Sequence, residues 1–351
     1  MPSRQKQNIQ LNKGAKGQMT KGYILGIDQG GTKTCAAVMD FNGNILSYHR
    51  TGGCYFPNDG LENAMGYIFD ATDNVLKGAK VSENDIDIVV AGVTGIDWDG
   101  DDDIIADALR VRFANQEIVA CNDCEIAYYS GALNPVGAVI CAGTGVNVAI
   151  IAPDDQKFVL GDYMKSSIQG GSAISRRAIE AVFDSEIGAF PATKLTKLFL
   201  DFSNETSVFG LLQRYITEEG FLLKIISLVP QIIGLANNGD FVAQEILTSF
   251  SDDLCRCFVA AMDKMNMLDI PCDIILAGSI FKGQQSYLTK EVVKTISQSA
   301  KSANIIGAKF HPLVGACILG MIKKSENVTE QIHANIAVSA EKFELLGMIE
   351  V

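Results

Sequence analysis

The stretch Gly26-Ile27-Asp28-Gln29-Gly30-Gly31-Thr32-Lys33-Thr34 decides how this chain is organised. The apolar run Tyr23-Ile24-Leu25 before it predicts a short buried strand, and the run from Cys35 to Asp40 after it predicts a second one. Asn42-Gly43 then supplies the left-handed φ values that a tight hairpin turn requires. The stretch is therefore expected to be a glycine-rich loop that joins two strands.

A loop of this composition suits a phosphate group. Its glycines, Gly30 and Gly31 among them, let bare backbone N–H groups approach an anion closely. Asp28 stands at the end of the first strand, where a carboxylate can hold a hydrated Mg²⁺. Side chains that can donate to phosphate oxygens follow in Thr32, Lys33 and Thr34.

Two other phosphate loops are excluded by the spacing. The P-loop needs Gly-Lys-Ser/Thr followed by a helix, but Thr32 separates Gly31 from Lys33 and a strand follows. The dinucleotide fingerprint also opens a helix, and its glycine spacing is absent. A glycine-rich hairpin loop without a ligand remains an alternative at this point.

Composition limits the class of protein. The chain has 351 residues, 48% of them hydrophobic, which is enough for two domains with sizeable cores. A net charge of −12 argues against nucleic acid or an anionic membrane as the main partner. No apolar run reaches the length of a membrane span, and no signal-peptide core is present. Nine cysteines without framework-like spacing predict reduced thiols in a cytoplasmic protein.

The same order of elements occurs twice. Residues 22–135 predict three strands in a meander, then helix, strand, helix, strand, which mixes an antiparallel edge with a parallel core. Residues 136–325 repeat this plan around a second glycine loop, Ala142–Asn147, with a helical insertion. Residues 1–21 are polar and basic and predict a disordered leader, and residues 326–351 form a C-terminal segment that could return to the first lobe.

This duplicated plan predicts an α/β fold of two lobes with mixed five-stranded sheets. Ligands in such sheets bind beyond the carboxyl ends of the strands, so the two glycine loops should face each other across a cleft. Asp123 follows a strand and precedes a helix, where it could accept a proton from a substrate hydroxyl or simply cap the helix. The residue pattern alone leaves these two roles open.

Five motifs in order resemble those of the actin-like (ribonuclease H-like) sugar kinases and ATPases. The closest likeness is to the N-acetylglucosamine kinases and the BadF/BadG/BcrA/BcrD ATPases. The likeness starts near residue 22 and covers nearly the whole remaining chain. The motifs are residues 26–34, Asn122-Asp123-Cys124-Glu125, Gly143-Thr144-Gly145-Val146-Asn147, residues 274–281 and Pro312-Leu313-Val314-Gly315-Ala316.

The resemblance implies ATP-dependent phosphorylation of an amino sugar of the N-acetylglucosamine or glucosamine type, with Asp123 as the base. It implies ATP and Mg²⁺ as cofactors, with Asp28 holding the metal. The implied partner is a small-molecule sugar, and a homodimer is left open. The residues implied to hold the nucleotide are Gly30, Gly31, Thr32, Lys33, Thr34, Gly143, Thr144, Gly145, Gly278 and Ser279.

The chain departs from the kinase pattern where the sugar should bind. Family kinases carry Gly-Asp-Glu-Gly-Ser before the helix at Ala173, whereas this chain has Ile168-Gln169-Gly170-Gly171-Ser172. Gln169 can hydrogen-bond a hydroxyl but lacks the charge that strengthens such bonds. The expected substrate residues are Asn58, Asp97, Asn147, Gln169, Gly171 and Ser172, although Asp97 could also cap the helix that follows it.

Two other functions stay open. One is a BadF-type ATPase that energises or regulates a partner protein, and the other is a non-catalytic nucleotide or sugar sensor. Cys121 and Cys124 form a C-x-x-C pair, but a metal or redox site would need a second pair or nearby histidines. His311, before Pro312, is expected to be a loop or cap residue.

Overall fold

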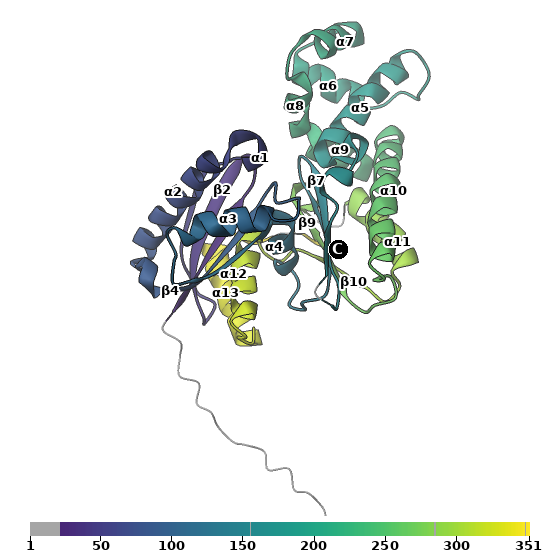
Figure 1. The fold of residues 1–351 in the computed structure, drawn as a ribbon. Coiled ribbons are helices and arrows are strands. Elements are labelled where there is room, and N and C mark those ends of the chain that lie inside the picture. Colours follow the sequence, from purple (N-terminus) through teal and green to yellow (C-terminus); the bar gives the residue numbers. More distant parts are fainter. Residues whose placement is uncertain (1–21, 155, 284–285, 348) are drawn as a thin grey trace, which may run out of the picture.

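The computed structural model describes residues 22–154, 156–283, 286–347 and 349–351 (Figure 1). The predicted leader, residues 1–21, lies outside the described residues.

The first sheet contains five strands in the order β3-β2-β1-β4-β5. β1 pairs antiparallel with β2 and parallel with β4, and β4 pairs parallel with β5. The strands are β1 (Tyr23–Gln29), β2 (Lys33–Asp40), β3 (Ile45–Gly52), β4 (Ile86–Val93) and β5 (Glu117–Asn122). The first strand runs through Gln29, so the loop of the opening motif is short and consists of residues 30–32.

The second sheet repeats this topology. Its order is β10-β9-β6-β7-β8, so β6 takes the place of β1, β7 that of β2 and β9 that of β4, with the same parallel and antiparallel pairings. The strands are β6 (Gly137–Ala142), β7 (Val146–Ile151), β8 (Lys157–Val159), β9 (Asp273–Ala277) and β10 (Asn304–Gly307). The predicted fold with two mixed five-stranded sheets is confirmed.

The outer face of the first sheet is covered mainly by α2 (Leu61–Ala79), which packs on β2 and β3 (Figure 1). α2 is preceded by α1 (Phe56–Asp59), a short helix in a segment whose composition is typical of a loop. α3 (Asp101–Arg110) packs on β5 and is shorter at both ends than a helix running from Asp99 to Phe113, which the periodicity indicates. Periodicity therefore finds the longer elements, but not all of their ends.

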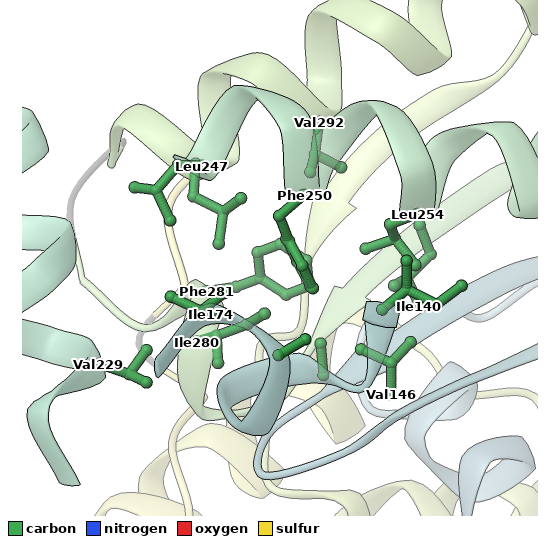
Figure 2. Close-up of a cluster of buried hydrophobic side chains, with 14 of the residues drawn as sticks. Ile140, Val146, Ile174, Val229, Leu247, Phe250, Leu254, Ile280, Phe281 and Val292 are labelled. Carbon is green, nitrogen blue, oxygen red and sulfur yellow. The ribbon is translucent and has the colours of Figure 1, made fainter. Parts of the chain in front are cut away.

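The second sheet carries a larger helical layer. α10 and α11 cover its outer face, and the helices α5–α9 extend beyond its end (Figure 1). Phe250 and Leu254 of α10 lie among buried side chains that include Ile140 of β6 (Figure 2). The helices are α5 (Gly170–Glu186), α6 (Leu195–Ser203), α7 (Val208–Thr217), α8 (Phe221–Ile225), α9 (Val229–Asn237), α10 (Phe241–Lys264) and α11 (Tyr287–Ser299).

Two helices cross between the sheets. α4 (Asp123–Tyr129) packs on β6, β7 and β9 of the second sheet and also on β1, β4 and β5 of the first, and α12 (Pro312–Lys323) packs on β1, β2 and β4 of the first. The two helices also pack on each other, and their backbones lie very close at Gly315. A Cβ at this glycine would lie 2.0 Å from the carbonyl oxygen of Ile126. One core cluster therefore includes side chains from both sheets.

Gly26 is needed for this packing and does not belong to the glycine loop. Gly26 lies inside β1, and a Cβ there would be 2.5 Å from the Cys317 sulfur of α12. In the sequence it is the first glycine of the phosphate motif, so it resembles a loop residue. Its structural role is to let α12 lie close to the strand.

The C-terminal segment lies against both lobes. α13 (Glu330–Lys342) contacts β3, and Asn335 Nδ2 donates to the carbonyl oxygen of Asn42 at 2.8 Å. Further along the segment, Leu346 forms an isolated antiparallel β-bridge with Phe310, and Ile349 forms an isolated parallel β-bridge with Gly283. The lobe boundaries 22–135 and 136–325 stay a prediction. The helix contacts do not follow them, because α12 lies in the second range but packs on the first sheet.

Within the described ranges, no single helix has both the length and the apolar character needed to cross a membrane. One bent pair, Val208–Thr217 with Phe221–Asn237, meets those two criteria only when its halves are taken together.

The crossing of α4 and α12 gives a test of stability. Gly315→Ala would force the two backbones apart, and we expect it to lower the free energy of unfolding by about 1–3 kcal/mol. Gly66→Ala is the matched control, because Gly66 is exposed on α2 and a Cβ there would have no neighbouring atom within 4 Å. That change should be neutral or stabilising by up to about 1 kcal/mol, since alanine favours the helix. Chemical denaturation measures both, and equal stability of the two variants would contradict the packing argument.

Candidate active site

Two adjoining cavities open between the lobes, and Asp123 lines both of them. One has a volume of about 460 Å³ and the other of about 330 Å³. Thr32 of the first glycine loop and Gly143 of the second also line both. The structure therefore brings the two glycine loops and Asp123 into one crevice.

The two glycine loops are built alike. The Gly30 N–H donates to the Lys33 carbonyl oxygen at 2.9 Å, and the Gly143 N–H donates to the Gly145 carbonyl oxygen at 2.8 Å. Each bond closes a tight turn. The residues at the tips of the two turns, Gly31, Thr32, Thr144 and Gly145, line the crevice. Backbone and hydroxyl donors on both sides are thus available to an anionic ligand.

Four of the expected site residues, Thr34, Asn58, Gly171 and Ser172, are not among the residues that line the crevice. Thr34 lies in β2 and is fully buried, and its hydroxyl oxygen accepts a hydrogen bond from Gln29 Nε2 at 3.1 Å. Its expected role as a phosphate donor is wrong, because the strand starts at Lys33 and turns Thr34 away. Asn58 is exposed on α1, and it is not among the residues that line the described cavities.

Lys33, His311 and Asp28 form a connected group on the first-lobe side. The Lys33 ammonium lies 2.8 Å from His311 Nε2, and His311 Nδ1 lies 3.6 Å from an Asp28 carboxylate oxygen. Burial, with the charge of Lys33 second, lowers the pKa of His311 to about 3, so the imidazole is neutral. When Nε2 accepts from Lys33, the ring proton is on Nδ1 and faces Asp28. When the proton is on Nε2, Nδ1 can cap α12 by accepting from the Leu313 N–H at 3.2 Å.

His311 is the site residue that sequence reasoning missed. It was expected to be a loop or cap residue, and it is the N-cap residue of α12. Its second contact, with Lys33, joins residues 278 positions apart. The only available signal was the place of the His-Pro pair, shortly after the last strand of the second sheet.

Asp28 and Asp123 are two carboxylates with raised pKa values. Burial raises the pKa of Asp28 to about 6, against the opposing effect of Lys33. Burial raises the pKa of Asp123 to about 7, and the charges of Asp28 and Asp97 add to this effect. Asn122, not Asp123, caps α4, because its side-chain oxygen accepts from the Cys124 N–H at 2.9 Å. Asn122 is therefore the N-cap residue of α4, while hydrogen bonds from the backbone N–H groups of Cys124 and Asp123 partly oppose the rise in the pKa of Asp123.

On the other side of Asp123, Asp97 and Asn147 line the larger of the two cavities. Asn122 Nδ2 donates to an Asp97 oxygen at 3.0 Å, and the Asn147 side-chain oxygen accepts from the Gly161 N–H at 3.0 Å. Asp97 does not cap the helix that follows it, because the N-cap of α3 is Gly100. Both side chains are held in place by these bonds and are in position for a polar ligand.

Gln169 lines this cavity, but its amide is engaged with the backbone. Its Oε1 accepts from the Val146 N–H at 3.0 Å, and its Nε2 donates to the Met164 carbonyl oxygen at 3.0 Å. The side chain thus joins the start of β7 to the segment before α5. This bridge needs an amide, because a carboxylate has no proton to donate to Met164.

Gly171 and Ser172 lie closer to the second glycine loop than to the Asp97 side. The Gly171 N–H donates to the Gly143 carbonyl oxygen at 2.8 Å, and the Ser172 hydroxyl donates to the Thr144 carbonyl oxygen at 3.0 Å. Gly171 lines a third cavity instead of the one beside Asp97. The structure therefore separates these two residues from the other expected substrate residues.

The third cavity, of about 560 Å³, lies beyond the second glycine loop. It is lined by Gly143 and Ser279, by an apolar wall from the helical layer and by polar groups at its edge. The wall consists of Ile226, Val229, Pro230 and Ile233, and the polar groups include Ser227, Asn237, Lys282 and Ser286. Gly278, which lines the smaller cavity of the crevice, has φ of +100°, and a Cβ there would be 2.1 Å from the Ala142 carbonyl oxygen, so only glycine fits beside the end of β6.

Asp123 gives a prediction about stability and pH. The folded chain holds this proton up to a pH near 7, whereas an ordinary aspartate loses it near 3.8, so folding binds a proton between these values. The stabilisation by protonated Asp123 is fully present below the unfolded pKa and is lost as pH rises through about 7. Asp123→Asn stays neutral, so its melting temperature should rise relative to that of the wild type as the pH increases from about 4 to about 7. Scanning fluorimetry in EDTA measures the melting temperatures of variant and wild type at each pH. The control Asp103→Asn changes an exposed carboxylate and should show no such pH-dependent rise. A melting-temperature difference between Asp123→Asn and wild type that does not change with pH would contradict the prediction.

Gln169 gives a second prediction. In Gln169→Glu a carboxylate faces the Met164 carbonyl oxygen, so we expect the free energy of unfolding to fall by about 1–3 kcal/mol. Gln213→Glu, at an exposed position on α7, is the control and should be close to neutral. Thermal or urea unfolding compares the two variants, and a Gln169→Glu protein as stable as the control would rule out the bridging role.

Comparison with known proteins finds two kinases of similar length. The N-acetylmuramic acid/N-acetylglucosamine kinase of Clostridium acetobutylicum is 24% identical over 300 residues, which is 85% of this chain and 97% of that protein. The N-acetyl-D-glucosamine kinase of Dictyostelium discoideum is also 24% identical and covers 87% of this chain and 100% of its own length.

A solved structure shares the fold. The ROK family glucokinase of Streptomyces griseus, in complex with glucose and AMPPNP, superposes with a TM-score of 0.56 at 20% identity over 85% of this chain and 99% of the glucokinase. The predicted two-lobed actin-like fold is thereby confirmed. The model of the BadF/BadG/BcrA/BcrD ATPase family matches residues 25–320. Because this match spans most of the chain, the protein belongs to the BadF/BadG/BcrA/BcrD ATPase family.

Proposed function

We propose that this protein transfers the terminal phosphoryl group of ATP to a hydroxyl group of an amino sugar of the N-acetylglucosamine or glucosamine type. The observation that carries the proposal is the position of Asp123. Asp123 lines both cavities of the crevice: the larger one, which also contains Asp97, and the smaller one, which also contains Asp28 and Lys33. A pKa near 7 suits a general base at neutral pH.

The nucleotide would occupy the crevice from the third cavity inward. The apolar wall around Val229 and Ile233 suits the adenine ring, and Ser279 at its edge suits the ribose. The phosphates would then extend between the two glycine loops, with donors from Thr32 and Thr144. Lys33, held by His311 at 2.8 Å, would supply positive charge beside them.

The residues around Asp28 fit a magnesium ion. Asp28 offers carboxylate oxygens, the ligand type that Mg²⁺ prefers, and lines the crevice although it is only 7% exposed. Its raised pKa indicates a carboxylate whose charge is not fully balanced by Lys33. Cys35 and His311 lie near it, but burial and the Asp28 charge raise the pKa of the Cys35 thiol, so it stays protonated. When bound, Mg²⁺ would neutralise charge on the phosphate oxygens.

The transfer step follows from these positions. The oxygen of the acceptor hydroxyl would attack the terminal phosphorus while the Asp123 carboxylate accepts the hydroxyl proton. ADP would leave on the opposite side of the phosphorus. Positioning and charge neutralisation supply most of the catalysis in such reactions. Since the two loops come from different lobes, closure of the lobes would align the reactants and exclude water.

The acceptor class is supported by the names of the two curated relatives, both kinases of N-acetylated amino sugars. Asp97 and Asn147 line the cavity in which the acceptor would bind. Gln169 would shape this cavity through its backbone bridge, without presenting the acid that family kinases have at the corresponding place. The two alternatives, an ATPase for a partner protein and a non-catalytic sensor, predict that no sugar is phosphorylated.

The test is an ADP-release assay with a panel of sugars, in which N-acetylglucosamine and glucosamine are compared with glucose. We expect ADP formation that depends on an amino sugar, and a phosphosugar detectable by mass spectrometry. Asp123→Asn should lower kcat by about 10²–10⁴-fold, because it removes the base, while ATP binding remains. Calorimetric titration with a non-hydrolysable ATP analogue checks the binding.

Asp103→Asn is the control, because Asp103 is an exposed carboxylate on α3 outside the described crevice. ADP formation that is the same with and without sugar would overturn the proposal and favour the ATPase alternative. Unchanged turnover by Asp123→Asn would remove the assignment of the base.

A further inference from the structure

The cavity beside Asp123 does not end at Asp97. Asp97 and Gly161 also line a neighbouring cavity of about 270 Å³, and Asp97 lines a further one of about 740 Å³. Because these three cavities share lining residues, they adjoin one another at Asp97. We define the outer groove as the two cavities beyond Asp97, both of which contain Trp98, Val159 and Tyr163.

The walls of the outer groove carry exposed aromatic side chains. Trp98 follows β4 on the first lobe and is 69% exposed, and Tyr163 follows β8 on the second lobe and is 79% exposed. The Tyr163 ring also contacts that of Phe158, with 6.1 Å between their centroids. Aromatic side chains gathered along a groove that adjoins a proposed active site are typical of ligand-binding sites. The negative faces of aromatic rings attract polarised C–H groups, which line the flat faces of pyranose rings.

The outer groove is also acidic. The carboxylates of Asp97, Asp99, Asp102 and Glu125 line its larger cavity, and the basic side chain among the lining residues is that of Lys157. Lys157 is paired with Glu125 at 2.5 Å, so its charge is already balanced. A ligand that carried a carboxylate would be repelled here, whereas hydroxyl and acetamido groups can donate hydrogen bonds to the acids.

Together these observations identify an occupant. We propose that the outer groove is a subsite for a second sugar ring, so that the acceptor is a neutral N-acetylated disaccharide or longer oligosaccharide rather than a single sugar. The inference rests on the proposed function, because the first ring would occupy the cavity beside Asp123. Since Trp98 and Tyr163 belong to different lobes, closure on the nucleotide would bring the two aromatic walls toward the second ring.

Trp98 is the one tryptophan of the chain, so its fluorescence can show whether a ligand occupies the outer groove. Intrinsic fluorescence of the full chain, excited at the tryptophan band, is titrated with N-acetylglucosamine and with N,N′-diacetylchitobiose in the presence of a non-hydrolysable ATP analogue and Mg²⁺. We expect a saturable change in Trp98 emission with the disaccharide. The disaccharide should bind about tenfold more tightly than the monosaccharide, as one aromatic stacking contact and its burial predict. Equal affinities, or no emission change with the disaccharide, would overturn the proposal.

Variants separate stacking from a structural effect. Trp98→Ala should lower the ratio of the disaccharide to the monosaccharide kcat/KM by about five- to tenfold, and Trp98→Tyr should restore most of it because an aromatic face is kept. Phe209→Ala is the control, because Phe209 is a similarly exposed aromatic residue on α7 that does not line the outer groove. It should leave the ratio of the two kcat/KM values unchanged. An equal loss for both sugars in Trp98→Ala would indicate a structural role and overturn the proposal.

The acidic lining is tested with a matched ligand. The disaccharide in which the second ring carries a lactyl ether has the same two rings and one added carboxylate. It should bind at least about tenfold more weakly than N,N′-diacetylchitobiose, and Asp99→Asn with Asp102→Asn should narrow this difference. Equal binding of the two disaccharides would overturn the assignment to neutral sugars.

Failure of the proposed function is distinguishable from failure of this inference. Binding of the disaccharide with a Trp98 signal but without transfer to any sugar would overturn the kinase reaction and support the groove. Efficient transfer to monosaccharides without preference for the disaccharide would overturn the groove and leave the kinase reaction standing.

Discussion

The architecture depends on one close contact between two helices. α4 and α12 come from different halves of the chain; α12 packs on the sheet of the other half, and α4 packs on both sheets. Their backbones approach so closely at Gly315 that a Cβ would lie 2.0 Å from the Ile126 carbonyl oxygen. Because α4 begins at Asp123 and α12 begins directly after His311, this contact also fixes the distance between the two lobes' contributions to the crevice. A packing constraint and the arrangement of the crevice thus share the same two helices.

The crevice concentrates negative charge that the protein balances only in part. Asp28 is buried and Asp123 partly buried where they line the crevice, and the charge of Asp28 raises the electrostatic cost of ionising Asp123. Lys33 is a nearby cation, and its partner His311 is kept neutral by burial. Such a site costs stability in the free protein, but it is ready for a ligand that brings its own cation. Perturbed carboxylates of this kind are common at functional sites, where they favour binding and proton transfer over folding.

Sequence patterns predicted the duplicated fold because it is built from local signals. Alternating apolar strands and two glycine turns repeat in order, and both sheets have the predicted make-up. What could not be predicted depends on contacts between distant residues. Gly26 resembled part of a phosphate loop, although it makes room for α12, and Thr34 continued a motif that the strand turns inward. His311 had no local pattern that linked it to Lys33. The amide of Gln169 resembled a weakened sugar ligand, because its backbone partners are not apparent from the sequence.

The exchange of α4 and α12 has a consequence for how the protein is made. The inner face of the first sheet, with Ile24 and Val90, is covered only in part by α4 until α12, which begins at Pro312, emerges from the ribosome. The first half therefore does not complete its core by itself, and the nascent chain carries a partly exposed apolar sheet until α12 has been made. Transiently exposed surfaces of this kind are prone to aggregate. Slow translation or early truncation would therefore burden the cell's chaperones more than the modest size of the finished protein suggests.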